Sequence, residues 1–522
     1  MKQRLFLLLC FAFFAAKSMA QDALKVLDQV KNLTVRNVNA IKQNNAVKGY
    51  FAFYEYDKVD KKTLLFRLNL YDENLNDLGT KDIEGPKDWE LISSAYDGNN
   101  FCFKFYDEKA KTYELKVYDQ QGKEVISNIT DINYNSKTNA KYRSYSALVS
   151  PEINEVDSNG FVDYIFNEPN DAFIMSYANG ATKKTWQQTY EPEGKSKIMV
   201  PNFLAGDNQM ILTAVTRIEK GLGNTKTENS VVANNIRNGN QLFDISTEFD
   251  DNHVVPITAI FSEDKITLVG LNYKTAKTYT RAPDGMAFIE MDKKGKILKT
   301  NFKTFEESLG KYLPIEDHQL EGGYYLYIHD IVHTKNNTNL VIAEKFKKAA
   351  DAGGVALTAL AMLSGGGSGG VIKLVLENMV VIEYDQDGNV IQAKEIPKGK
   401  GTTGVIPGST TQNPYTLATI ANMDGWMDYM YTLSNDDNSQ VTFNFIDYDR
   451  LSDDANAKKT KNFGQIKYDN GSINVDRIPI KSGDNSKADL VHIYQGKPGY
   501  ILELAYFKKD KKATMEMIKL NN

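Results

Sequence analysis

The decapeptide YDQDGNVIQA, at Tyr384–Ala393, recurs in altered form at three other places in this chain. Close copies, YDQQGKEVIS and MDKKGKILKT, begin at Tyr118 and Met291, and a looser copy, YDENLNDLGT, begins at Tyr71. Apolar and polar residues alternate around each copy, which is the pattern of a half-buried β-strand. The Asp and, in the closer copies, the Gly suit a tight turn, because Asp bonds nearby backbone amides and Gly accepts a positive φ. The unit therefore predicts a strand, a turn and a second strand.

A second pair of strand-like runs precedes each copy, so that the repeat is a meander of four strands. The clearest unit has strands predicted at Leu91–Ala95, Phe101–Tyr106, Tyr113–Tyr118 and Glu124–Ile129. Four antiparallel strands in about 40 residues make one blade of a propeller. Eight such units can be drafted, and seven also fit if two of them form one irregular blade. The drafted units are 47–87, 89–130, 145–193, 197–248, 255–304, 322–398, 414–469 and 487–522.

The last of these units has only three convincing strands. A strand-like run, Asn32–Ile41, precedes the first unit, and we expect it to pair with the last unit and close the ring. Closure protects edge strands that would otherwise invite aggregation. The resulting organisation is a signal peptide at 1–20, an N-terminal segment with the closing strand at 21–46, and a β-propeller at 47–522.

On the Tyr-Asp-x-x-Gly hairpin and the strand spacing, the chain resembles β-propeller proteins, in particular secreted bacterial families of unknown function. The resemblance covers most of the chain and implies an all-β fold of seven or eight four-stranded antiparallel blades. The Asp-box of sialidases and the Trp-Asp dipeptide of WD repeats do not occur. FSEDK (Phe261–Lys265) is similar to a turn of TolB-type propellers but lacks its Pro and Gly. No catalytic residue can be carried over from a known family.

One segment, at about 349–372 within the sixth unit, breaks the strand pattern. Ala352–Leu363 is small and apolar and predicts a short helix, and GGGSGG (Gly365–Gly370) predicts a flexible joint. The simpler interpretation of Ala349–Gly370 is a helix packed on one face of the propeller. The alternatives are a mobile lid, or an element that contacts a membrane or a partner.

The N-terminus predicts export. Lys2 and Arg4 precede an apolar run, Leu5–Ala16, and small residues precede an expected cleavage between Ala20 and Gln21. The run is too short for a transmembrane span, so we expect a soluble protein in the periplasm or outside the cell.

The charge of the chain argues against nucleic acid as a partner, and its cysteine content excludes an intramolecular disulfide. Cleavage changes the formal net charge from −5 to −8, and Lys and Arg do not cluster along a face, which argues against nucleic acid as a partner. Only Cys102 remains after cleavage, so no intramolecular disulfide can form, and its position between Phe101 and Phe103 predicts a small buried residue.

Motifs for metals and nucleophiles are weak. His329 and His333 in HDIVH would lie about 13 Å apart along a strand, too far to share a zinc ion. DQDGN, at Asp385–Asn389, is similar to a calcium loop, but its twelfth position is Ile396 instead of Glu. Ser368 stands in a Gly-x-Ser-x-Gly pattern within the glycine joint, where a nucleophile elbow is not expected. We expect no metal, no cofactor and no identifiable catalytic residue.

The 29 tyrosines could form sugar-binding surfaces, but those of the repeat recur at one strand position, which favours packing between blades. The densest aromatic clusters are GYY (Gly323–Tyr325) and GWMDYMY (Gly425–Tyr431). The favoured hypothesis is a binding module for a glycan or a protein partner. The alternatives are a secreted hydrolase or lyase acting on glycans or peptides, and a component of a cell-surface assembly.

Overall fold

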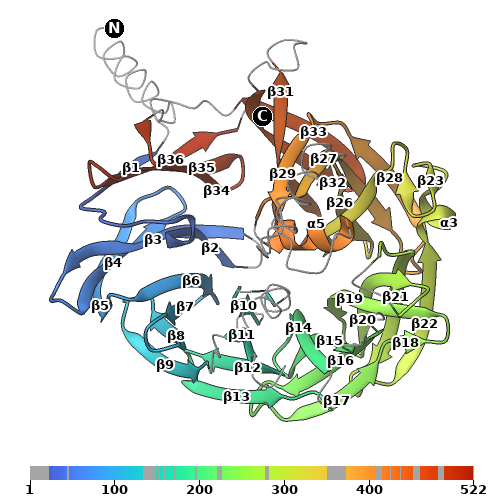
Figure 1. Ribbon diagram of the computed structural model, residues 1–522, viewed down its shortest axis with the longest axis horizontal. Helices are drawn as coiled ribbons and strands as arrows, with labels where there is room; N and C mark the ends of the chain where they lie inside the picture. Colours follow the sequence, from blue (N-terminus) through green and yellow to red (C-terminus); the bar gives the residue numbers. More distant parts are fainter. Residues whose placement is uncertain are drawn as a thin grey trace, which may run out of the picture. The chain divides into compact units, whose positions relative to one another are not determined.

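The computed structural model shows an all-β protein whose sheets are successive antiparallel meanders (Figure 1). Two compact units carry them: unit 1 takes its residues from Met1–Ile41, Val47–Lys87 and Ser482–Asn522, and unit 2 from Lys42–Ala46 and Asp88–Lys481. The structure describes residues 23–43, 46–132, 149–150, 152–156, 159–167, 172–193, 197–219, 226–276, 281–349, 372–405, 414–423, 425–435, 437–450, 459–479 and 487–520.

Eight four-stranded meanders among these residues define a β-propeller, in agreement with the higher of the two predicted blade counts. We number the blades 1 to 8 in chain order. Blade 1 has the strand order β2 (Val38–Gln43), β3 (Ala46–Lys58), β4 (Thr63–Asp72) and β5 (Asp77–Pro86). Blade 8 has the order β34 (Leu490–Gln495), β35 (Tyr500–Phe507), β36 (Lys512–Lys519) and β1 (Leu24–Asp28).

An N-terminal strand does complete the last blade, but it is not the predicted one. β1 pairs antiparallel with β36, with Val26 opposite Thr514. The prediction that Asn32–Ile41 closes the propeller is wrong, because this run contains a 3-10 turn at Val35–Asn37, capped by Thr34, and then enters β2 of blade 1. Both segments read as strands, and only the pairing distinguishes them.

The other six blades belong to unit 2 and follow one another in chain order, from β6–β9 to β30–β33 (Figure 1). Among these six blades, blade 5 has a fifth strand, β18, and blade 6 has a fifth strand, β29, which pairs with β27. The bounds of all the strands of the six blades are as follows. Their strands are β6 (Trp89–Tyr96), β7 (Asn100–Asp107), β8 (Thr112–Asp119) and β9 (Glu124–Asp131) in blade 2; β10 (Asn154–Glu155), β11 (Phe161–Asn167), β12 (Ala172–Asn179) and β13 (Lys184–Tyr190) in blade 3; β14 (Lys197–Gly206), β15 (Met210–Glu219), β16 (Lys226–Asn235) and β17 (Gln241–Ser246) in blade 4; β18 (Glu248–Phe249), β19 (Asn252–Phe261), β20 (Lys265–Tyr273), β21 (Gly285–Asp292) and β22 (Ile297–Thr304) in blade 5; β25 (Tyr325–His333), β26 (Asn339–Lys348), β27 (Ile372–Tyr384), β28 (Val390–Ile396) and β29 (Gly401–Val405) in blade 6; and β30 (Tyr429–Ser434), β31 (Gln440–Arg450), β32 (Lys459–Asp469) and β33 (Ser472–Pro479) in blade 7.

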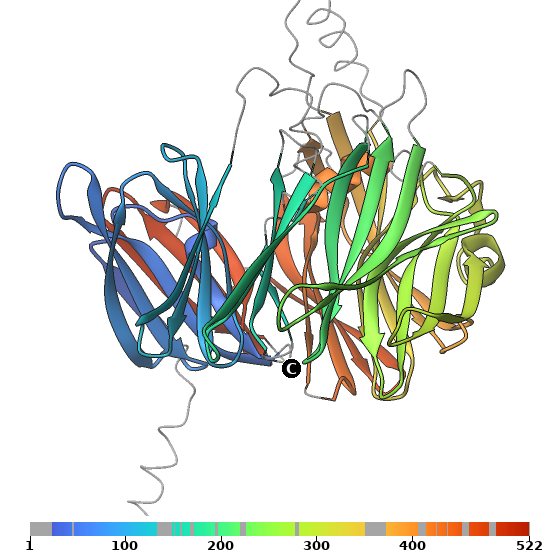
Figure 2. The ribbon, with the colours of Figure 1, turned by 90° about the horizontal axis from the view of Figure 1, so that it is seen from below.

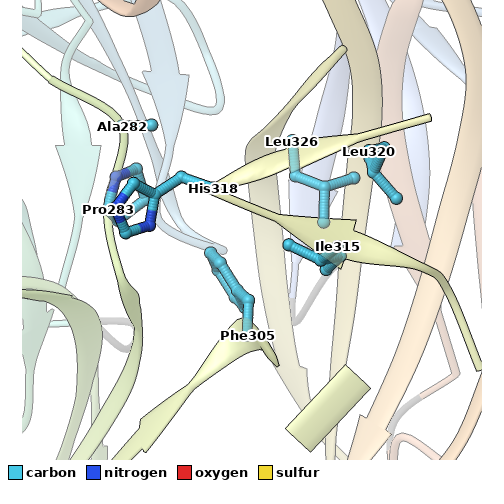
Figure 3. Close-up of a pocket in the computed structure, with 7 residues that line it drawn as sticks. All are labelled: Ala282, Pro283, Phe305, Ile315, His318, Leu320 and Leu326. Carbon is cyan, nitrogen blue, oxygen red and sulfur yellow. The ribbon is translucent and has the colours of Figure 1, made fainter. Parts of the chain in front are cut away.

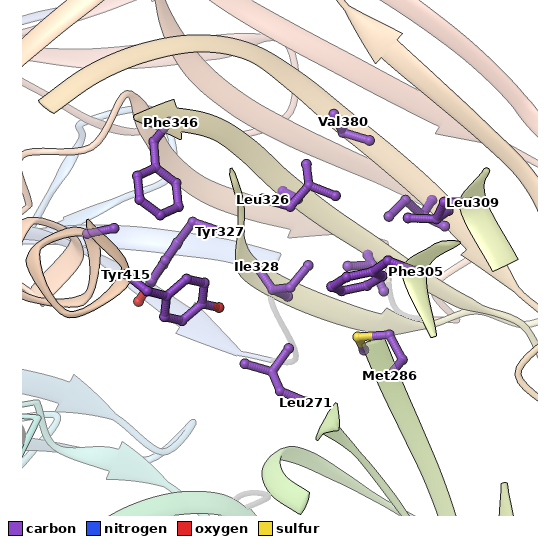
Figure 4. Close-up of a cluster of buried hydrophobic side chains, with 14 of the residues drawn as sticks. Leu271, Met286, Phe305, Leu309, Leu326, Tyr327, Ile328, Phe346, Val380 and Tyr415 are labelled. Carbon is purple, nitrogen blue, oxygen red and sulfur yellow. The ribbon is translucent and has the colours of Figure 1, made fainter. Parts of the chain in front are cut away.

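Apolar side chains join each blade of unit 2 to the next. One cluster links blades 2 and 3 through Cys102 and Phe161, and others link blades 3 to 4, 4 to 5 and 6 to 7. The largest cluster joins blades 5 and 6, and Figure 4 shows Leu271 and Met286 of blade 5 beside Ile328 of blade 6. Because the blades stand face to face (Figure 2), their inner strands are buried on both sides, which supplies the core.

The repeated motif forms the hairpin between the third and fourth strands of blades 1, 2, 5 and 6, as the sequence predicts. Each copy has a register shift at its first residue. In each, the Asp carboxylate accepts a hydrogen bond from the backbone N–H four residues on; these are Asp72, Asp119, Asp292 and Asp385. The Gly residues have positive φ, for example 70° at Gly122, and in the looser copy Leu75 takes this conformation with φ 62°. The motif therefore builds the fold.

In the described part of unit 2, two helices interrupt the strands. The short helix α3 (Phe305–Leu309) leads into a small hairpin of β23 (Ile315–Glu316) and β24 (Gln319–Leu320), and α5 (Pro414–Met423) packs against β25, β26 and β27. The sequence analysis expected neither helix. The helix predicted at Ala352–Leu363 lies outside the described residues. The longest described helix, α5, has ten residues, half of the roughly 20 that a membrane-spanning helix requires.

Candidate functional site

A solvent-accessible groove of about 320 Å³ lies within unit 1, between strand β1 and one face of blade 1. Its volume falls at the lower end of the ~300–1,000 Å³ range of ligand sites. Consecutive residues of β1, Lys25 to Gln29, form one wall. The other wall is formed by seven residues of blade 1: Tyr54, Tyr56, Arg67, Asn69, Tyr71, Asp77 and Thr80.

The strand register explains why these residues share a wall. Arg67 is opposite Tyr54 on β3, and Asn69 is opposite Thr80 on β5. Side chains two residues apart on a strand point to the same face, so Arg67, Asn69 and Tyr71 of β4 all face β1. Pairing of β1 with β36 holds the facing wall in place. All the residues that line the groove therefore lie between Lys25 and Thr80, and the C-terminal strand β36 only supports one wall.

The floor of the groove is a set of connected hydroxyl and amide groups. Asn69 donates from Nδ2 to the Tyr54 hydroxyl at 3.1 Å and accepts at Oδ1 from the Thr80 hydroxyl at 2.9 Å. Burial raises the pKa of both Tyr54 and Tyr71 above the ordinary value, so both phenols keep their protons at neutral pH. A phenol that accepts one bond can still donate another, but Tyr54 is only 2% exposed, so Thr80 is the exposed member of this row.

Each charged side chain that lines the groove forms an ion pair, and the Lys25–Asp77 pair joins the two walls. Arg67 binds Asp82 through Nε to Oδ1 at 2.7 Å and Nη2 to Oδ2 at 2.8 Å, and its Cζ lies 3.4 Å from the centroid of the Tyr56 ring. Lys25 of β1 forms an ion pair with Asp77 of β5. Asp28, on the rim, lies 3.7 Å from the ammonium of Lys512. Each charged residue that lines the groove therefore has a neutralising partner.

The tyrosines of the repeated motif are structural, as the sequence predicts. Tyr71, Tyr118 and Tyr384 are all nearly inaccessible, with exposed fractions of 1%, 2% and 0%. Tyr54 and Tyr56, which precede the first motif, belong to the groove and were not singled out by the sequence analysis. Their only signal is the alternation in FYEYDK, which many strands share.

A second group of polar residues, the buried charge network, joins blades 6 and 7. Lys398 lies 2.5 Å from Asp428 and 3.3 Å from Glu344, and the other Glu344 oxygen lies 3.2 Å from Nε2 of His329. His329 in turn stacks on the ring of Tyr429 with centroids 4.6 Å apart. Asn422 at the end of α5 bonds the remaining nitrogen of His329, and the Tyr448 hydroxyl donates to Asp428 at 2.8 Å.

The protonation of this network follows from its burial and its pairing. Burial raises the pKa of Asp428 to about 6, with the charge of Glu344 acting in the same direction. Burial would also raise the pKa of Glu344, but the hydrogen bond with His329 and the charge of Lys398 outweigh it and lower this pKa. The two carboxylates raise the pKa of Lys398 despite its burial. The side chains of His329, Glu344 and Lys398 have no solvent exposure, so the network connects blades and is closed to a ligand.

The residues that were considered as metal ligands bond other side chains of the protein. His333 bonds Asn339, away from the partners of His329, and Asp387 pairs with Lys299. Among the described residues, no three His, Cys, Asp or Glu side chains are grouped to hold a metal ion. Cys102 is fully buried, and burial raises the pKa of its thiol well above the ordinary value, as expected of an unreactive cysteine. Ser368, Ala20 and Gln21 lie outside the described residues.

A cavity in unit 2 beside His318 is too small for a ligand. It holds about 10 Å³, the space of roughly one water molecule, and Figure 3 shows His318 next to Pro283 at one end and Leu326 at the other. His318 lies 3.1 Å from the Arg281 guanidinium, through Nε2 and Nη2. This site is a packing defect next to a polar contact.

The blades and the groove define a β-propeller protein with an open, polar, aromatic-lined cavity in unit 1. The chain belongs to DUF6770, a family of unknown function, whose sequence profile it matches over residues 1–521. No curated protein matches its sequence.

Several solved propellers are similar in fold, and all are remote in sequence. The WD40 domain of SCAP from fission yeast is 8% identical, with a TM-score of 0.38 over 95% of this chain and 98% of that one. The β-propeller domain of the Trilobed protease from Pyrococcus furiosus is 9% identical, with a TM-score of 0.35 over 86% and 100%. Prolyl oligopeptidase B from Galerina marginata is 8% identical, with a TM-score of 0.38 over 93% of this chain and 56% of that one. At these values the similarities indicate neither a ligand nor an activity.

Proposed function

We propose that this protein is a ligand-binding propeller and that the groove between β1 and blade 1 is its binding site. The observation that carries the proposal is the combination of an open volume of about 320 Å³ with a connected polar floor and the half-buried Tyr56 ring in its wall. Ligand sites are concave and position a few polar groups among aromatic surfaces. The buried charge network has comparable polarity but offers no space.

The proposal is tested by filling the groove. Thr80 is an exposed position on β5 whose side chain lines the groove, and aromatic residues are well tolerated in strands, so Thr80→Trp should block the cavity without unfolding the blade. Lys81→Trp is the matched control, because the next residue on the strand points to the opposite face.

The measurement is a thermal-shift screen of the mature protein against oligosaccharides, short peptides and divalent cations. A ligand at 100 times its Kd stabilises the folded protein by about 2.7 kcal/mol, which is readily detected. We expect at least one compound to stabilise the wild type and Lys81→Trp but not Thr80→Trp. A hit that stabilises all three proteins equally would place the binding site elsewhere.

We further propose that residues 1–20 direct export and are removed between Ala20 and Gln21. The positive start, the apolar run Leu5–Ala16 and the small residues before Gln21 support this. Mass spectrometry of the protein from its native host should give a chain that begins at Gln21. Replacement of Leu8 and Leu9 by Arg should leave residues 1–20 attached and the protein inside the cell. Secretion of that variant would contradict the proposal.

A further inference from the structure

We infer that the ligand of the groove is a neutral glycan. This inference rests on the proposed function of the groove as a binding site. It uses three properties of the groove: its charge balance, the chemistry of its floor and the aromatic ring in its wall.

The charge balance favours an uncharged ligand. Lys25 pairs with Asp77, Arg67 with Asp82 and Asp28 with Lys512, so the groove has no unpaired charge to attract a phosphate, a sulfate or an ammonium group. An ionic ligand would have to replace one member of an ion pair. The new pair would then replace one that the groove already has, with no net gain of charge pairing. A neutral ligand leaves all three pairs intact.

The floor favours hydroxyl groups. The Tyr54 phenol, the Asn69 amide and the Thr80 hydroxyl form one hydrogen-bonded row, in which donors and acceptors alternate over short distances. A sugar presents hydroxyls that both donate and accept at comparable spacing, and can extend such a row. Lipids and other apolar ligands fit poorly, because Val26 and Leu27 are the aliphatic residues of the lining and the other residues are polar, charged or aromatic.

The wall supplies an aromatic surface. Tyr56 is half-buried, lines the groove and is held in orientation by the Arg67 guanidinium stacked on its ring. The face of an aromatic ring carries negative potential and attracts the positively polarised C–H groups on one face of a sugar. Because Arg67 is fixed by two hydrogen bonds to Asp82, the ring is positioned before any ligand arrives. Such preorganisation reduces the entropy lost on binding.

The test uses an array of neutral, sialylated and sulfated oligosaccharides and a second array of tetrapeptides, probed with the wild type and four variants. We expect neutral oligosaccharides to bind, Tyr56→Ala to lower their affinity at least tenfold and Thr80→Trp to abolish binding. Lys81→Trp and Tyr106→Ala, which removes a half-buried tyrosine of blade 2, should bind as the wild type does. Circular dichroism melts of all variants separate lost binding from lost folding.

The outcomes distinguish this inference from the proposed function. If peptides or charged glycans bind and Thr80→Trp alone removes that binding, the groove is the site but its ligand is not a neutral glycan. The remaining outcome is that no probe binds, or that every probe that binds the wild type also binds Thr80→Trp. In that case both the inferred ligand class and the proposed binding role of the groove are wrong.

Discussion

The ammonium of Lys398 lies 2.5 Å from the carboxylate of Asp428, measured from Nζ to Oδ2, in a region that solvent does not reach. The same ammonium lies 3.3 Å from Glu344, so one lysine is paired with two buried carboxylates from different blades. A buried charge costs several kcal/mol unless it is paired. The junction between blades 6 and 7 therefore depends on Lys398.

Replacing Lys398 by Met should lower the free energy of unfolding by about 3–5 kcal/mol, because it leaves Glu344 and Asp428 buried without a cation. Urea denaturation of the variant measures this. Lys400→Met is the matched control: its ammonium lies 3.0 Å from Glu377, but the side chain is 59% exposed. An exposed pair contributes at most about 1 kcal/mol. Equal losses from the two substitutions would show that the network does not act as a buried ion pair.

The pKa of Asp428 predicts a particular pH dependence of stability. Burial raises this pKa from 3.8 to about 6 in the folded protein, so between these values the folded state binds a proton that the unfolded state releases. Stability contributed by this group is therefore present below pH 4 and is lost as the pH rises from about 4 to about 6. Urea denaturation at several pH values should show a smaller decline over this window in Asp428→Asn than in the wild type. Parallel profiles would contradict the assignment.

The repeated hairpin offers a third prediction. Asp119 accepts hydrogen bonds from the backbone N–H groups of Gln121 and Lys123 at 3.0 and 2.8 Å. Asp119→Ala removes Oδ1, the acceptor of both bonds, and should cost about 1–2 kcal/mol. Asp119→Asn retains an acceptor oxygen and should lose less than half as much. Thermal unfolding of both variants checks this, and an equal loss in both would mean that the negative charge, and not the hydrogen bonds, stabilises the turn.

The hairpins and most strands could be predicted because their signals are local. The four strands predicted between Leu91 and Ile129 each correspond to one of β6 to β9, with ends that differ by at most two residues. The alternation of apolar and polar residues could not show which strands are buried on both faces. β7 is one of these, and Lys104, which the pattern places on an exposed face, is buried and bonded to Asp163 of the next blade at 2.6 Å.

The candidate site was less predictable, since its parts come from distant segments. Asn32–Ile41 and Leu24–Asp28 have similar strand character, and choosing between them requires the register with β36. That choice also creates the groove, because β1 is one of its walls. For the same reason no local pattern marks Lys398, whose partners are Glu344 of β26 and Asp428, the residue before β30.

The pairing of β1 with β36 gives a final prediction. Deleting Leu24–Asp28 from the mature protein leaves the edge of β36 open and removes one wall of the groove. Because open edges template aggregation, we expect a lower unfolding midpoint, increased light scattering and no response to groove ligands. The control is Leu24→Ser, which changes a side chain that is 58% exposed and lies outside the groove lining but keeps the backbone pairing. Exposed substitutions of this kind usually change stability by no more than about 0.5 kcal/mol. If the deletion behaves like this control, blade 8 does not need β1, and the pairing cannot be what completes the fold.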